Sequence, residues 1–86
     1  MSETIVVDVQ LFARLRELCD DRARVSLELE APADAEACFA RLCAEYPSLA
    51  PQRKALVVAV NEDYAGWDRR LAAGDVVSFI PPVSGG

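Results

Sequence analysis

The 86-residue sequence contains no histidine, and its nine basic residues are outnumbered by fourteen acidic ones, which gives a formal net charge of −5. Without histidine the chain lacks the side chain best suited to proton transfer near neutral pH. We therefore expect that it is not an enzyme by itself. Nucleic acids and anionic membrane surfaces are bound by clusters of lysine and arginine, so the acidic balance argues against both as partners.

The sequence also lacks the patterns of a disulfide framework, a zinc site and a membrane segment. Its three cysteines, Cys19, Cys38 and Cys43, show no C-x-x-C spacing and fall in apolar periodic patterns, so we expect them to be small core residues. No apolar run approaches the roughly 20 residues that span a bilayer. The acidic start, Met1–Thr4, is unlike a signal peptide. These absences predict a cytoplasmic protein without a bound metal or cofactor.

Several segments carry the patterns of β-strands. Apolar and polar residues alternate from Ile5 to Phe12 and from Arg24 to Glu30, as they do in half-buried strands. The nearly continuous β-branched run 56–60 predicts a central strand. We expect a short edge segment over residues 64–67 and a last strand over 76–80.

The spacing of apolar residues changes to a helical period in two places. Residues 13–19 predict a short helix that ends at Asp20 and Asp21. A main helix follows Asp34, whose carboxylate can accept hydrogen bonds from the first free amides, and Pro47 is expected to end it. One main helix packed on one face of a small mixed sheet is an α+β arrangement. The β-grasp (ubiquitin-like) fold is the natural candidate, and by analogy with it the first and last strands lie parallel at the sheet centre.

The sequence ends in an uncharged segment, Pro81-Pro82-Val83-Ser84-Gly85-Gly86. We divide the chain into a domain of residues 1–80 and a flexible tail of residues 81–86. Glycines without Cβ atoms fit narrow channels, and prolines donate no amide hydrogen bond, so the tail is expected to leave the sheet and enter a partner's active site. A carboxylate reacts with nucleophiles only after activation, for example as an acyl-adenylate. We therefore predict that the carboxylate of Gly86 is the reactive group.

Two apolar residues interrupt the polar face of the predicted strands. Phe12 shares a face with Asp8 and Gln10, and Ile80 shares a face with Ser78. Each lies at the C-terminal end of its strand, so a parallel pairing of these strands brings them together at the base of the tail. An exposed apolar patch at this place would suit the docking of a partner. In the alternative interpretation, Phe12 belongs to the following helix and Ile80 covers an edge.

These features resemble the MoaD-like branch of the MoaD/ThiS sulfur-carrier family over nearly the whole chain. The matching segments are Leu11–Leu18, Val58–Asn61 and Leu71–Gly86. The final P-P-V-x-G-G is the most specific part, and the main helix around Cys38 and Phe39 is the least similar.

The resemblance implies that an ATP-dependent activating enzyme adenylates Gly86 and that a sulfurtransferase converts it to a thiocarboxylate. The tail then inserts into the large subunit of molybdopterin synthase, in a heterotetramer. There its sulfur passes to cyclic pyranopterin monophosphate in molybdenum cofactor biosynthesis. ATP is used by the activating partner, and the catalytic side chains belong to the large subunit. The family's docking surface maps onto Phe12, Tyr64 and Ile80, with Tyr64 the weaker match because that position is often aliphatic.

Three other functions stay open on the sequence alone. A thiamine-pathway sulfur carrier shares the fold and the Gly-Gly end but usually lacks the F-A-x-L-R-E-L segment and the Pro-Pro pair. A ubiquitin-like protein modifier uses the same activated intermediate, so the tail cannot separate it from a sulfur carrier. A plain interaction domain would use only the patch around Phe12 and Ile80.

Overall fold

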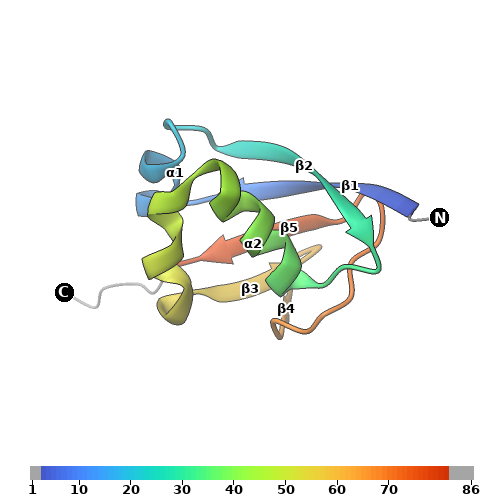
Figure 1. Ribbon diagram of the computed structural model, residues 1–86. Coiled ribbons are helices and arrows are strands. Elements are labelled where there is room, and N and C mark those ends of the chain that lie inside the picture. The colour runs from blue at the N-terminus through green and yellow to red at the C-terminus, as the bar shows by residue number, and fades with distance from the viewer. Residues whose placement is uncertain (1–2, 82–86) are drawn as a thin grey trace.

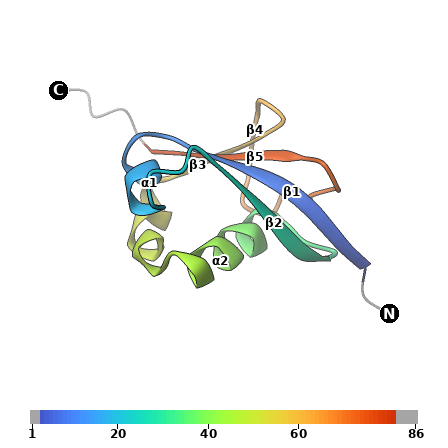
Figure 2. The same ribbon diagram turned by 90° about the horizontal axis from the view of Figure 1, so that it is seen from above.

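In the computed structural model, which describes residues 3–81, a five-stranded mixed sheet is covered on one face by helical segments (Figures 1 and 2). The elements in chain order are β1 (Glu3–Leu11), α1 (Ala13–Leu18), β2 (Arg24–Ala31), α2 (Ala35–Glu45), the 3₁₀ segment η1 (Pro47–Ala55), β3 (Val57–Val60), β4 (Asp63–Ala65) and β5 (Val76–Ile80). The strand order is β2-β1-β5-β3-β4. The predicted α+β arrangement, with one main helix on one face of a small mixed sheet, is confirmed.

The first and last strands lie side by side at the centre of the sheet. β1 and β5 run parallel, with Leu11 opposite Phe79. β5 also pairs antiparallel with β3, where Ile80 lies opposite Val57. The parallel placement expected by analogy is therefore confirmed. As a result β1 and β5 end at the same edge of the sheet, next to α1 and the start of β3 (Figure 1).

The hydrophobic core lies between the inner face of the sheet and the helical segments. Strand β2 alternates between buried and exposed residues along its length, as its sequence predicted. The largest fully buried side chains are Phe79, Leu15, Leu27, Leu42, Leu49, Val7, Val9, Val58, Val60 and Val77. Cys19 and Cys38 are fully buried core residues, as expected, whereas Cys43 is only half-buried at the edge of the core.

The main helix begins where the sequence predicted, but the chain stays helical beyond its predicted end. The Asp34 carboxylate accepts a hydrogen bond from the Ala37 amide at 2.8 Å, which caps α2. Tyr46 ends α2, and Pro47 then opens the unpredicted segment η1. Proline is well suited to the first position of a helix, because the missing N–H has no partner there. Leu49 of η1 is fully buried and completes the core beneath α2.

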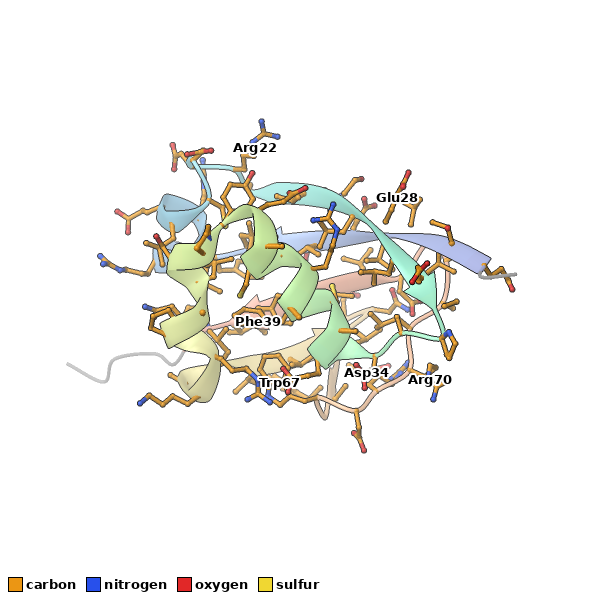
Figure 3. The ribbon with its side chains drawn as sticks, in the orientation of Figure 1. Arg22, Glu28, Asp34, Phe39, Trp67 and Arg70 are labelled. Atoms are coloured by element: carbon orange, nitrogen blue, oxygen red, sulfur yellow. The ribbon has the colours of Figure 1, made fainter. Side chains whose placement is uncertain are left out.

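Trp67 packs on the core, although the sequence predicted it in an edge segment. Its ring meets Phe39 edge to face with centroids 5.5 Å apart (Figure 3). It also stacks on Phe79 with centroids 5.7 Å apart. The Arg53 guanidinium lies 3.6 Å from the Trp67 ring centroid and donates hydrogen bonds of 2.6 and 3.0 Å to the Glu36 carboxylate. These hydrogen bonds lower the pKa of Glu36. The contacts connect α2, η1 and the segment before β5.

The hairpin between β3 and β4 turns on two residues with left-handed backbone conformations. Asn61 has φ 50° and Glu62 has φ 74°, the pattern of a two-residue turn that matches the twist of the strands. The Asn61 side chain donates a 2.9 Å hydrogen bond to the Asp75 carboxylate and accepts one of 2.9 Å from the Val76 amide. The turn is therefore fixed to the start of β5.

We expect Asn61→Ala to lower the free energy of unfolding by about 2–3 kcal/mol, because two hydrogen bonds are lost and alanine is strained at positive φ. Asn61→Gly loses the same hydrogen bonds without that strain, so a smaller loss of about 1–2 kcal/mol is expected. Urea denaturation monitored by Trp67 fluorescence measures both. Equal losses for the two variants would contradict a strained backbone at this position.

Candidate functional site

The two apolar residues singled out in the sequence lie together at the ends of the central strands. Phe12 directly follows β1 in an extended conformation (φ −123°, ψ 150°) and is 44% exposed. Leu11 lies opposite Phe79, so the next residues, Phe12 and Ile80, follow at the same end of the two central strands. Ile80 is half-buried. The parallel pairing on which the predicted meeting of Phe12 and Ile80 depends is confirmed, whereas their role in docking stays a prediction.

The exposed apolar surface extends from these residues across two further strands. Val57, 45% exposed, is the cross-strand partner of Ile80. Tyr64, 78% exposed, lies opposite Ala59 on the edge strand β4. We call Phe12, Val57, Tyr64 and Ile80 the apolar patch. It lies on the outer face of the sheet, the face opposite α2, which no helix of the described residues covers (Figure 2).

The sequence predicted three members of the patch but not Val57. The run that contains Val57 is apolar at every position, so it shows no alternation from which its exposed face could be read. Only the pairing of β3 with β5 reveals that Val57 and Ile80 share a face.

A polar pair lies beside the patch at the centre of the outer face. The Ser78 hydroxyl, which is largely buried, donates a 3.1 Å hydrogen bond to the Gln10 side-chain oxygen. Within residues 3–81 no buried side-chain nitrogen or oxygen lacks a partner. The Asp75 carboxylate accepts hydrogen bonds from Ala72 and Asn61, so turn geometry explains it without an acid–base role.

The predicted tail begins where β5 ends. Ile80 is the last residue of β5, and the half-buried Pro81 follows it outside the strand. The other tail residues assigned from the sequence, Pro82, Val83, Ser84, Gly85 and Gly86, lie outside the described residues, so their roles stay predictions.

Neither an activated thiol nor a metal site is indicated among the described residues. Burial raises the pKa of Cys38 to about 12 and, with the neighbouring Asp20, that of Cys19 to about 11. Burial also raises the pKa of Cys43. Thiols are nucleophiles only as thiolates, so the raised pKa values disfavour the reactive form of these cysteines. Over the same range no cluster of three His, Cys, Asp or Glu residues could hold a metal ion, and no helix is long and apolar enough to cross a membrane.

Comparisons with known proteins identify the family. The sequence profile of the ThiS family matches residues 9–86. The molybdopterin synthase sulfur carrier subunit of Mycobacterium tuberculosis is 35% identical over 82 residues, which cover 95% of this chain and 99% of the relative.

Solved structures show the same fold. The crystal structure of small archaeal modifier protein 1 from Haloferax volcanii superimposes with a TM-score of 0.82 at 25% identity, covering 94% of this chain and 99% of that one. A Helicobacter pylori chain, from a complex of subunits 1 and 2 of molybdopterin-converting factor, superimposes with a TM-score of 0.64 at 25% identity. The match covers 95% of this chain and 100% of that chain. These neighbours confirm the β-grasp fold. The chain therefore belongs to the ThiS family of MoaD/ThiS sulfur carriers.

Proposed function

We propose that the chain is the sulfur carrier of molybdopterin synthase, and that Gly86 carries the sulfur as a thiocarboxylate. The observation that supports this most directly is the position of the apolar patch at the end of β5, where the chain leads into P-P-V-S-G-G. A partner that docks on the patch therefore receives the tail. Residues 81–86 can reach at most about 20 Å from the sheet, at roughly 3.3–3.6 Å per residue.

The proposed chemistry takes place on the carboxylate and uses groups of other proteins. In the first step a carboxylate oxygen of Gly86 attacks the α-phosphorus of ATP on an activating enzyme, and pyrophosphate leaves. A sulfur nucleophile supplied by a sulfurtransferase then attacks the acyl carbon, and AMP leaves. This nucleophile is the terminal sulfur of a cysteine persulfide, so the product is an acyl disulfide. A second thiol of the donor protein attacks the donor's cysteine sulfur, forms a disulfide with it and releases Gly86 as a thiocarboxylate. The raised pKa values of the cysteines agree with this scheme, because burial disfavours the thiolate form in which a cysteine would take up sulfur.

We infer that the chain gives up its sulfur while bound to the large subunit of molybdopterin synthase. The two proteins would form a heterotetramer in the cytoplasm. The Helicobacter pylori neighbour comes from a complex of two subunits of molybdopterin-converting factor, which supports such a partner. The large subunit would supply the catalytic side chains and bind cyclic pyranopterin monophosphate. The chain described here is then a donor subunit and not an enzyme by itself.

A second candidate function is protein modification. The likeness to small archaeal modifier protein 1, at a TM-score of 0.82, favours it. In that case the activated Gly86 would form an amide with a lysine of another protein. Peptide mass spectrometry would detect the Gly-Gly remnant on such lysines.

Genetic complementation tests the proposed pathway. The chain is expressed in bacterial strains that lack either the molybdopterin or the thiamine sulfur carrier, together with its own activating enzyme. We expect molybdoenzyme activity to return in the first strain and the thiamine requirement to persist in the second. Restored thiamine synthesis without molybdoenzyme activity would overturn the proposal.

A further inference from the structure

A hollow of about 280 Å³ opens on the outer face of the sheet beside the apolar patch. It is lined by Gln10, Asn61, Glu62 and Val76, and thus lies between the central strands and the β3–β4 turn. Gln10 precedes Phe12 by two positions, and Glu62 precedes Tyr64 by two positions. The hollow therefore continues the surface that carries the apolar patch.

Two carboxylates, one lining this hollow and one beside it, form no ion pair with a lysine or arginine of residues 3–81. Glu62 is an exposed lining residue, and Asp8 lies directly opposite Val76 in the pairing of β1 with β5. One oxygen of Asp8 accepts a 2.9 Å hydrogen bond from the Ser26 hydroxyl. Among residues 3–81, neither carboxylate lies within 4.0 Å of a lysine or arginine nitrogen. Arg24, which lies opposite Gln10, also forms no ion pair with them.

The wall of the hollow is held in place before any partner binds. Asn61 is tied to Asp75 and to the Val76 amide by two hydrogen bonds of 2.9 Å. The Gln10 side chain is held by Ser78 at 3.1 Å. A prearranged site loses less entropy on binding than a mobile one, so its charges can select between partners.

We propose that the hollow receives a lysine or arginine side chain of the protein that docks on the apolar patch, so that Asp8 and Glu62 act as specificity residues for that partner. This inference rests on the proposed function. An apolar centre supplies buried area, whereas unpaired charges at its margin favour a partner of opposite charge and raise the association rate. The net charge of −5 acts in the same direction.

The test compares neutral variants of similar shape. Asp8→Asn/Glu62→Gln is titrated against the large subunit of molybdopterin synthase from the same organism, at about 0.05 M and about 0.5 M salt. We expect affinity about tenfold weaker than that of the unaltered chain at low salt, and a difference below about threefold at high salt. Glu28→Gln is the matched control, because it removes one charge from the same face, opposite Val6 and outside the hollow. It is expected to weaken binding by less than about twofold.

Two results would overturn the inference alone. The first is tight binding by the unaltered chain that the double variant does not weaken. The second is that Glu28→Gln weakens binding as much, per charge removed, as Asp8→Asn/Glu62→Gln does. That result would indicate only a general attraction between the acidic chain and a basic partner. Absence of binding by the unaltered chain would overturn the proposed function and this inference together. A charge swap tests the same contact. Where an Arg→Glu or Lys→Glu substitution in the large subunit weakens binding, Glu62→Lys in this chain should restore the affinity.

Discussion

Deletion of Gly86 is expected to abolish sulfur loading. Without this residue the carboxylate belongs to Gly85 and stops about 3.5 Å short of its place in the activating enzyme. A displacement of even 1 Å can cost about 100-fold in rate, so we expect at least that loss. Intact mass spectrometry after incubation with the activating enzyme, ATP and a sulfur source measures it. The unaltered chain should gain the mass difference between one sulfur and one oxygen, and the shortened chain should gain nothing.

The deletion should leave the folded domain unchanged, because the hydrophobic core is built from residues that precede the tail. The urea midpoint of the deletion variant should therefore equal that of the full chain. An equal mass gain in both proteins would show that another group carries the sulfur. The three cysteines would be the next candidates, although burial raises the pKa of each and disfavours the reactive thiolate. A variant with all three replaced by alanine would decide between them and the tail.

The sequence predicted those elements whose two faces differ in polarity. Strands β1 and β2 alternate, and the structure buries the apolar set of each. The start of α2 was predicted because Asp34 can cap a helix, and it does so. The parallel pairing of β1 with β5 came from fold analogy, because periodicity alone does not show which strands are neighbours.

The remaining elements depend on contacts that sequence periodicity does not encode. Segment η1 has two prolines and little helical patterning, and it is stabilised by contacts of Leu49 with the core and of Arg53 with Trp67. Trp67 lies in a stretch without regular periodicity, and its position is set by Phe39 and Phe79. Such residues are fixed by tertiary packing, which becomes visible only once the sheet is assembled.

The candidate site was predictable where a residue broke a pattern. Phe12 and Ile80 stood out because each is apolar on a polar face, and the structure places them at the same end of the paired strands β1 and β5. The hollow was not predictable, because it requires both the register between β1 and β5 and the left-handed turn at Asn61 and Glu62. Glu62 in its lining and Asp8 beside it look like ordinary surface charges in the sequence.

Replacing Phe12 with aspartate is expected to weaken binding to the large subunit by roughly 100-fold. Truncated aromatic residues at interface centres commonly cost about 2–4 kcal/mol, and tenfold in affinity corresponds to about 1.4 kcal/mol. The charge adds the cost of burying an unpaired carboxylate. Isothermal titration calorimetry with the purified large subunit measures the change. Phe12→Ala separates the loss of the ring from the added charge.

The same substitution should not destabilise the fold, because Phe12 is 44% exposed and lies outside the buried core cluster. Phe12 is also the N-cap residue of α1, where no side chain now caps the helix. Aspartate is a favoured residue at that position and can stabilise a helix by about 0.5–2 kcal/mol relative to alanine. Affinity and stability should therefore change in opposite directions, which a partly unfolded variant could not produce.

Val6→Asp is the matched control for the patch. Val6 is 47% exposed on β1 and lies on the same outer face as Phe12, but it is opposite Glu28, away from the apolar patch. It therefore adds the same charge to the outer face without touching the patch, and the affinity should change by less than about threefold, as for a rim charge. If Val6→Asp weakened binding as strongly as Phe12→Asp, the partner would be responding to the charge of the whole face. A large difference between them would instead place the contact at the end of β1, where the neighbouring strand β5 leads into the tail.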